Sequence, residues 1–511
     1  MKKIIDKKIK PQSEDVSQFH DFYKVVWKQN KVETIKFDKV KTLNRLKNMG
    51  FYRFDTNDED FILCKIEKNI ISRVSKKQLI DAFEQYIINL PPIRHTNIQN
   101  DTEIEIEITG KFLLEFFYNN LEFLFSNTIL QRLQNDKKIN LQVDIQKSKY
   151  MYFQNCFVEI TENEIKAKDY SELQNFVWKT NILPYNFEYS SEVGNFEKFI
   201  FNLSNKEESR KKSLMSILGY LLHGFYDYKT FLVLLTDSDI DTDGEPNGRT
   251  GKTLIGKALS QCLNADATQS GYTEIDGKTF KPTDERKYQK ADIDTQLIHI
   301  NDIFSWFKIE HLFTDITDGL TVRKMYEKPL FIRSKIMMSS NKTIEVDGAS
   351  ARDRVHIFEV ANHYSDKYSP EMEFKQWFFR DWNETEWNKF FSFIVRCCQV
   401  FLKNGLVKAD LKNYELRLLI EHTSTEFINW FEQQLFDLIN EVYTAKLDRD
   451  ISKKFLFNTF IEQYPDFKFR KNFTQKKLTK WVRKYLQYKK VDFSEARSTE
   501  DVFIIHYSEN L

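Results

Sequence analysis

The chain has 511 residues, and its 76 Lys and Arg residues almost balance its 75 Asp and Glu residues, so a net charge of +1 does not indicate a charged partner. The five cysteines (Cys64, Cys156, Cys262, Cys397 and Cys398) have no paired C-x-x-C spacing, which argues against a zinc site and a disulfide framework. The first residues lack the apolar core of a signal peptide and no apolar run is long enough to span a membrane, so we expect a cytoplasmic protein without a membrane partner.

Residues 1–140 are predicted to form an α+β domain, one of several that this length allows. The runs 51–54 and 61–66 are typical of paired strands, and 76–90 and 110–127 have helical spacing. No pair of carboxylates in this region has the spacing of a catalytic site, and its role stays open.

Residues 141–228 are predicted to form a connector and helical region. The alternating run 150–161 predicts two strands that turn near Gln154 and Asn155. Leucine and isoleucine recur on one face of a predicted helix over 206–226. Because an apolar strand follows this helix directly, we expect the helix to pack on the next domain.

The next segment carries the most informative motif. The apolar run 231–235 is followed by Gly-Glu-Pro-Asn-Gly-Arg-Thr-Gly-Lys-Thr at 244–253 and then by residues with helical spacing. A strand, a glycine-rich turn, Gly-Lys-Thr and a helix are typical of a P-loop, in which backbone N–H groups and the helix N-terminus bind phosphates. Lys252 would contact the β- and γ-phosphates of ATP, and the Thr253 hydroxyl would bind Mg²⁺. The candidate nucleotide-binding residues are Pro246, Asn247, Gly248, Arg249, Thr250, Gly251, Lys252 and Thr253.

This loop departs from the P-loop pattern at one position. The first glycine of G-x-x-x-x-G-K-[ST] should stand at 246, where the chain has Pro246. Only 14 glycines occur in the chain, yet Gly244, Gly248, Gly251 and Gly256 lie close together here and could supply the turn. The clustering favours a phosphate-binding loop, and the alternative is a strand–helix turn that contains Gly-Lys-Thr by chance.

Two further apolar strands of the predicted nucleotide domain, residues 229–365, end in polar residues. The first ends in Asn301 and Asp302, where a carboxylate would reach a Mg²⁺ ion beside Thr253. The second leads to Asn341, whose side chain could reach the γ-phosphate and orient water. These residues support a nucleotide site because of their order and spacing after the glycine-rich loop.

The predicted nucleotide domain also contains two basic segments. Residues 318–329 predict two β segments with a basic, aromatic tip. Arg352 and Arg354 stand just before another strand, where surface ion pairs with Asp353 or Glu359 are the alternative to a catalytic role.

This ordered set resembles the superfamily 3 helicases, the compact AAA+-like group that includes the papillomavirus and polyomavirus replicative helicases. In particular, it resembles the helicase part of phage and plasmid primase-helicases, the poxvirus D5-like group. There the order is Walker A, Walker B, a basic B′ segment, a C motif that ends in Asn, and arginines. The matching residues here are Gly248 to Thr253, Asn301 with Asp302, Arg323 to Lys328, Asn341, and Arg352 with Arg354. The resemblance covers about residues 200–365, and Asn301 stands where a second acid is common.

The resemblance implies an ATP-dependent DNA helicase that unwinds DNA during replication of a phage, plasmid or other mobile element in a bacterial or phage-infected cell. Its cofactors would be ATP and Mg²⁺, with Thr253 and Asp302 on the metal. Lys252, Asp302 and Asn341 would be catalytic, and Arg352 or Arg354 would act in trans as an arginine finger. A finger supplied in trans requires a ring, which is a homo-hexamer in this family. Single-stranded DNA in the pore would contact Arg323, Lys324, Tyr326 and Lys328.

The C-terminal part divides into a helical, aromatic segment over 366–445 and a basic module over 446–511. In the helical segment Cys397 and Cys398 are adjacent on a helix, so we expect that both thiols cannot face inward. Between 451 and 490 twelve Lys and Arg residues stand against two acids. Two helices, the first expected over 451–464, and a β hairpin favour a winged helix that binds duplex DNA through Lys476, Lys477, Lys480 and Lys484. The alternative is a solvated basic face on a structural module.

The predicted fold is an α/β AAA+-like P-loop ATPase core with an α+β N-terminal region, a helical segment and a C-terminal winged-helix-like domain. Two other functions stay open. One is a P-loop ATPase that assembles on DNA as an initiator, transposition or defence factor without processive unwinding. The other is a full primase-helicase, but residues 1–140 are short for a polymerase and show no clear D-x-D pair. A separate primase or polymerase would then be a partner.

Overall fold

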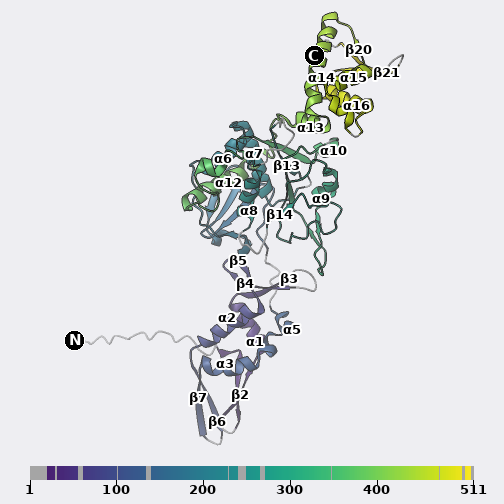
Figure 1. The fold of residues 1–511 in the computed structure, drawn as a ribbon. Helices are drawn as coiled ribbons and strands as arrows, with labels where there is room; N and C mark the ends of the chain where they lie inside the picture. The colour runs from purple at the N-terminus through teal and green to yellow at the C-terminus, as the bar shows by residue number, and fades with distance from the viewer. Residues whose placement is uncertain are drawn as a thin grey trace, which may run out of the picture. The chain divides into compact units, whose positions relative to one another are not determined.

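The computed structural model describes residues 20–28, 31–55, 61–99, 102–133, 140–227, 229–239, 249–264, 271–346, 348–470, 472–497 and 501–507. These residues form two units (Figure 1). The first unit holds the described part of 1–142 together with 168–182, and the second holds 143–167 and the described residues from 183 onward. No helix within these described ranges is long and apolar enough to cross a membrane.

The first unit mixes helices with short sheets around an aromatic core that includes Phe22, Phe83 and Phe117. The predicted strand pair is confirmed, because β3 (Phe51–Asp55) and β4 (Phe61–Glu67) are antiparallel. The helix expected over 110–127 is wrong in its extent, since the chain breaks at Asn120 and Ser126. The other α-helices and β-strands that lie wholly in this unit are β1 (Tyr23–Lys28), β2 (Lys31–Phe37), α1 (Lys39–Asn48), β5 (Ile70–Arg73), α2 (Lys76–Ile88), β6 (Ile93–Gln99), β7 (Thr102–Ile108), α3 (Gly110–Asn119), α4 (Leu121–Phe125), α5 (Asn127–Leu130) and β11 (Val177–Trp178).

The second unit is built on a five-stranded parallel sheet with the order β14-β15-β18-β13-β19. Its strands are β13 (Leu232–Asp237), β14 (Tyr272–Asp276), β15 (Leu297–Asn301), β18 (Lys335–Ser340) and β19 (Val355–Val360). Nearly all residues of β13, β15 and β18 are buried, as expected for a parallel sheet covered on both faces.

Helices cover one face of this sheet (Figure 1). They are α6 (Asn195–Leu203), α7 (Glu208–Leu222), α8 (Lys252–Leu263) and α12 (Glu384–Asn404). Val233 and Leu235 of β13 face this helical layer, whereas Leu232 and Leu234 face a second core with α9 (Phe313–Thr317). The predicted hairpin over 150–161 is present as β8 (Ser148–Phe153) and β9 (Phe157–Thr161), and β9 also contacts α12.

The expectation for the two adjacent cysteines is wrong. Cys397 and Cys398 are both buried, because α12 packs against α7 on one side and against β9 and α6 on others. Gly219 permits the close contact with α7, since a Cβ there would collide with the backbone oxygen of Cys397.

The C-terminal residues share a core of their own. Its helices are α13 (Tyr414–His422), α14 (Thr425–Ala445), α15 (Lys453–Gln463) and α16 (Gln475–Tyr488), and its antiparallel sheet has the order β20 (Arg449–Ser452), β22 (Asp501–Ile505), β21 (Phe493–Arg497). The helix expected over 451–464 therefore begins later than predicted, because its first residues pair with β22.

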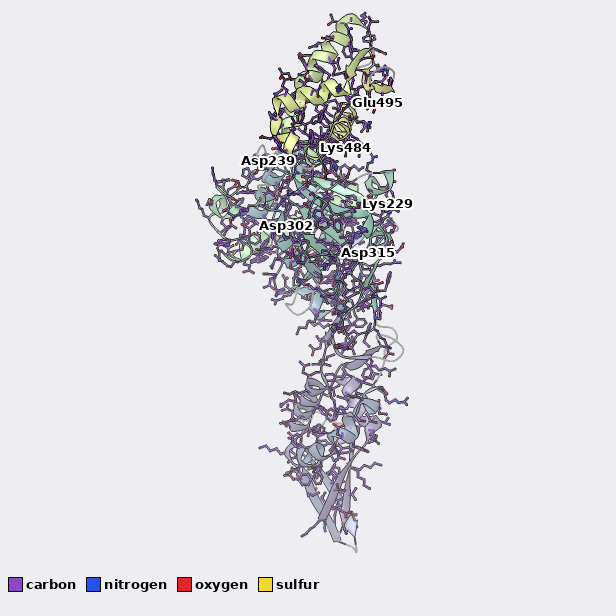
Figure 2. All side chains as sticks on the ribbon, turned by 45° about the vertical axis from the view of Figure 1, so that its right-hand side comes forward. Lys229, Asp239, Asp302, Asp315, Lys484 and Glu495 are labelled. Carbon is purple, nitrogen blue, oxygen red and sulfur yellow. The ribbon has the colours of Figure 1, made fainter. Side chains whose placement is uncertain are left out.

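An ion cluster joins the parts of this C-terminal core. The buried Lys453 ammonium donates to Glu495 Oε2 at 2.6 Å and to Asp501 Oδ1 at 2.8 Å. Figure 2 labels Glu495 among the side chains of this C-terminal core. Arg483 of α16 donates to the same Glu495 carboxylate, which lowers the pKa of Glu495 to about 2. The cluster thus holds α15, α16 and the β21–β22 hairpin in one arrangement.

Candidate functional site at the carboxyl edge of the sheet

The strand order creates a switch point between β13 and β18. After β13 the chain crosses to β14 at the far edge, returns through β15 to β18, and then passes β13 to reach β19 on its other side. Connections from the two neighbouring strands therefore leave in opposite directions and open a crevice at their carboxyl ends. Open α/β sheets bind their ligands in this crevice.

A cavity of 560 Å³ lies at these carboxyl ends, and we call it the edge pocket. Predicted site residues from three distant segments line it: Arg249, Thr250, Gly251, Lys252, Thr253, Asp302 and Asn341. Pro246, Asn247 and Gly248 lie outside the described residues. Residues that the sequence did not single out, Ser365, Asp366 and Ser369 to Met372, form a further wall.

Gly251 and Gly256 are required for different reasons. Gly251 has a φ of +103°, and a Cβ there would lie 2.8 Å from the Phe199 ring, so an L side chain is excluded. It precedes α8, whose first turn presents the exposed Thr253 at the pocket. Gly256 instead allows α8 to pack on β14 and β15, because a Cβ would meet Tyr272 and His299.

The Lys252 ammonium is held at the end of β13. Its Nζ donates to Asp237 Oδ1 and, at 3.0 Å, to Thr250 Oγ1, whose hydroxyl also donates to Asp237. Both side chains of the Lys252–Asp237 pair are 7% exposed. Burial lowers the pKa of Lys252, whereas the Asp237 carboxylate acts in the opposite direction. Asp237 therefore compensates the positive charge of the buried Lys252 at the pocket wall. The sequence did not predict this role, because a single carboxylate after an apolar run has no distinctive pattern.

Asp302 has an unusual backbone conformation for a residue with a side chain, with a φ of +61°. Its Oδ2 lies 2.6 Å from Lys278 Nζ, and its Oδ1 accepts from Asn341 Nδ2 at 3.3 Å. Non-glycine residues in this conformation concentrate at functional sites, where the surrounding structure fixes them. Here the conformation directs Asp302 toward Asn341, and the contact with Lys278 was not predicted.

Asn301 belongs to a closed ring of hydrogen bonds across β14, β15 and β18. Its amide donates to Glu274 Oε1 at 3.0 Å and its oxygen accepts from Ser339 Oγ at 2.6 Å. His299 bonds Ser339 and Tyr272, and the Tyr272 hydroxyl bonds Glu274. A carboxylate at 301 could not donate and would face Glu274, which gives a physical reason for Asn where a second acid is common. Burial lowers the pKa of His299 to about 3.

The residues at the edge pocket fit a magnesium ion that takes some of its ligands from the protein and others from a bound phosphate. In the described part of the chain, no group of three or more His, Cys, Asp and Glu residues could hold a metal ion. Mg²⁺ is usually bound by one or two protein groups and keeps waters and phosphate oxygens. The Thr253 hydroxyl and the Asp302 carboxylate line one cavity and match this sparse ligation.

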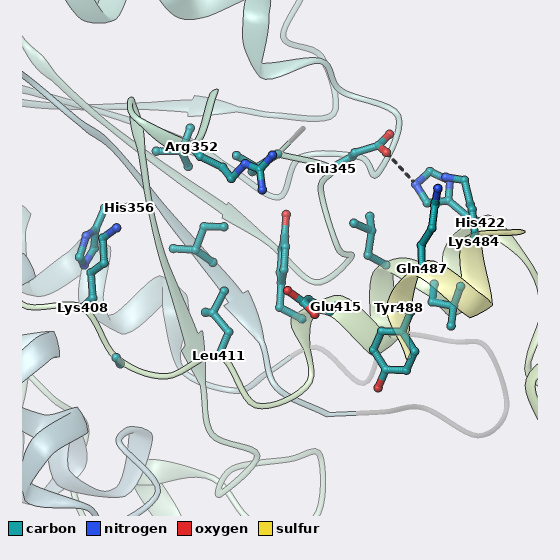
Figure 3. Close-up of a pocket in the computed structure, with 17 residues that line it drawn as sticks. Glu345, Arg352, His356, Lys408, Leu411, Glu415, His422, Lys484, Gln487 and Tyr488 are labelled. Carbon is teal, nitrogen blue, oxygen red and sulfur yellow. Dashed lines mark ion pairs between the residues drawn. The ribbon is translucent and has the colours of Figure 1, made fainter. Parts of the chain in front are cut away.

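Arg352 and Arg354 are not among the described residues that line the edge pocket. Arg352, at the end of α10 (Ala349–Arg352), lines a separate cavity of 490 Å³ together with Lys484 of α16 (Figure 3). The Arg354 guanidinium donates to Ser350 O at 3.1 Å and to Ser350 Oγ at 2.6 Å, and it lies over the Phe313 ring. Within the described ranges neither arginine pairs with Asp353 or Glu359.

The predicted basic hairpin is present as β16 (Leu320–Val322) and β17 (Leu330–Ile332). Tyr326 at its tip is fully exposed, with a φ of +63°. The neighbouring cations are partly engaged, since Lys324 Nζ lies 3.0 Å from Asp292 and Arg323 Nε lies 3.9 Å from Glu285. Lys328 is exposed at the same tip.

The predicted basic helix is α16. Leu478, Trp481, Val482 and Tyr485 are buried on one face. On the other face the four predicted lysines are exposed: Lys476, Lys477, Lys480 and Lys484.

No model of a known protein family matches the chain, and no curated protein sequence matches it. Among solved structures, the apo structure of NrS-1 C terminal region (305–718) has a TM-score of 0.31 and 13% identity, covering 71% of this chain and 97% of that chain. Two A form apo structures of the same region have TM-scores of 0.30 and 0.32, also at 13% identity. At these TM-scores, the function has to be argued from the residues of this chain.

Proposed function

We propose that the chain is an ATP-driven DNA helicase that unwinds DNA during replication of a phage, plasmid or other mobile element. We also propose that the edge pocket is its ATP site. The observation that supports this most is the convergence of Lys252, Thr253, Asp302 and Asn341 on one cavity at the switch point of a parallel sheet. A bound triphosphate needs a helix N-terminus, a lysine and a metal ligand in one place. The first turn of α8 and the ends of β13, β15 and β18 supply all three.

Each side chain has a separate task in this proposal. Lys252 would exchange Asp237 for the β- and γ-phosphates. Thr253 and Asp302 would hold Mg²⁺, which neutralises phosphate charge when bound. Asp302 would also accept a proton from the attacking water, which Asn341 would orient beside the γ-phosphate.

The surroundings of the pocket support an AAA+-like, P-loop ATPase that works as a homo-hexamer. Arg352 and Arg354 lie away from the edge pocket of their own chain, which suits a finger that reaches the nucleotide of a neighbour. The order α14, β20, α15, α16 and the β21–β22 hairpin, with exposed lysines on α16, supports a winged-helix-like module that binds duplex DNA.

The function is tested by ATP hydrolysis with and without single-stranded DNA. We expect DNA-stimulated hydrolysis by the parent chain, and retained nucleotide binding without turnover in Asp302→Asn, because an amide neither charges the metal site nor takes a proton. Lys278→Ala is a control that removes the ion pair but keeps the carboxylate. Normal turnover by Asp302→Asn would place the catalytic carboxylate elsewhere.

Substitutions in the two proposed DNA-binding surfaces should impair different steps, namely duplex binding and the coupling of ATP hydrolysis to unwinding. Neutralising Lys476, Lys477 and Lys480 should weaken duplex binding and flatten its log–log salt dependence by about 0.9 for each DNA phosphate that the helix no longer neutralises, while unwinding survives at low salt. Changing Lys324 and Lys328 to alanine should leave duplex affinity nearly intact but uncouple ATP hydrolysis from unwinding.

A control for the hairpin variant follows from its ion pair. Asp292→Asn keeps the Lys324 ammonium and removes the negative charge that faces it, so this variant should unwind DNA as the parent does. Normal unwinding by the hairpin lysine variant, or an unchanged salt slope in the helix variant, would show that the corresponding surface does not bind DNA.

A further inference from the structure

The beginning of α13 is bound to the ends of three strands around the edge pocket. Asn413 Nδ2 donates to the backbone oxygen of Ser238, just after β13, at 2.7 Å. The Glu359 carboxylate of β19 accepts from the backbone N–H groups of Lys412 and Asn413. The Tyr414 hydroxyl donates to the backbone oxygen of Ile344, which follows β18, at 2.5 Å.

Arg417, the next turn of α13, bonds two neighbouring strands at once. Its Nη1 donates to the backbone oxygen of Asp237 and, at 3.2 Å, to Thr236 Oγ1, both at the end of β13. Its Nη2 donates to the backbone oxygen of Asn341, after β18, at 2.8 Å. The guanidinium is a planar fork that presents several donors in fixed directions, so it can hold two chains at one separation.

These two strands carry the two sides of the proposed phosphate site. Asp237 holds the Lys252 ammonium through its carboxylate, and Asn341 contacts Asp302 through its amide. Arg417 itself is not among the described residues that line the edge pocket. It contacts the backbone of the residues that carry the chemistry, and those contacts bridge the crevice at the switch point.

We propose that Arg417 is a positioning residue for ATP hydrolysis, which sets the distance between the lysine side and the Asn341 side of the edge pocket. This inference rests on the proposed function of that pocket. The pairing of β18 with β13 ends at Ser340, so without the guanidinium the backbone of Asn341 would lose its link to β13, and its side chain would orient water poorly. A displacement of about 1 Å at a reacting group can reduce a rate about 10²-fold. Lys252 and the first turn of α8 would still bind the nucleotide.

The test compares kcat and KM for ATP in the full chain with Arg417→Met and Arg417→Lys. We expect kcat to fall about 10²-fold in Arg417→Met, with KM changed by less than about threefold. Arg417→Lys should recover little, because one ammonium cannot span both backbone oxygens. Tyr414→Phe is the matched control, since it removes a hydrogen bond of the same helix to Ile344 without touching Asp237 or Asn341, and its kcat should stay at the parent value.

A second measurement separates positioning from general stability. In an Asn341→Ala background, Arg417→Met should lower kcat by less than about threefold, because residues that act through one another are not additive. Full additivity, an unchanged kcat in Arg417→Met, or a rise in KM at constant kcat would each overturn the inference. If the parent chain hydrolyses no ATP, the proposed function itself fails; if the parent hydrolyses ATP and the variants match it, only the role of Arg417 fails.

Discussion

Lys252→Ala is expected to reduce ATP hydrolysis by at least about 10²- to 10³-fold, because the variant has one charged donor fewer to stabilise the developing phosphate charge. The structure adds a second effect. The Asp237 carboxylate, which is 7% exposed, would lose its ion pair with Lys252 and keep the hydrogen bond from the Thr250 hydroxyl. Breaking a buried ion pair from one side destabilises a protein by roughly 3–5 kcal/mol, so part of the fall in activity could come from unfolding.

A double variant separates the two effects. Asp237→Asn with Lys252→Ala removes both charges, so its free energy of unfolding should lie closer to that of the parent, while hydrolysis stays abolished. Lys257→Ala, an exposed lysine on the same helix, is the matched control and should hydrolyse ATP normally. The measurements are steady-state hydrolysis and denaturant unfolding of the four chains. Hydrolysis by the double variant at the parent rate would remove Lys252 from the catalytic site.

Replacing one of the two candidate finger arginines should reduce ATP hydrolysis by a comparably large factor without preventing ATP binding. Either Arg352→Ala or Arg354→Ala should bind ATP yet hydrolyse it about 10³-fold more slowly, because an arginine finger stabilises only the transition state. Arg354 is braced by Ser350 and Phe313, whereas Arg352 lines the cavity of Figure 3, so the two positions differ in how firmly the guanidinium is held.

Mixing experiments test whether the finger acts in trans. The impaired arginine variant mixed with Lys252→Ala protein should recover activity, since some sites would combine an intact lysine from one subunit with an intact arginine from its neighbour. Each variant alone at the same total concentration is the control. If hexamers are present by mass measurement and no ratio restores hydrolysis, the sites are not shared between subunits.

Local sequence was sufficient to predict β13, β15, β18 and β19 and the polar residues that follow β15 and β18, whereas β14 was not predicted. Buried parallel strands are continuous apolar runs, so 231–235 and the runs before Asp302 and Asn341 could be recognised. Because parallel strands end at one edge, the polar residues after them had to meet, and they line one cavity.

Contacts between distant segments could not be predicted in this way. Arg417 lies 180 residues after Asp237, and no local pattern distinguishes it from other arginines on helices. Lys278 and Glu274 acquire their roles only through the pairing of β14 with β15. The burial of Cys397 and Cys398 likewise depends on α12 being covered on several sides, which a single helical periodicity does not reveal.

Strand displacement from a forked DNA tests the proposed function most directly. The full chain with ATP and Mg²⁺ should release the displaced strand, and Asp302→Asn or the omission of ATP should prevent release. ATP hydrolysis stimulated by single-stranded DNA without displacement, at any protein concentration and at low salt, would contradict a helicase and indicate an ATPase that assembles on DNA without processive unwinding.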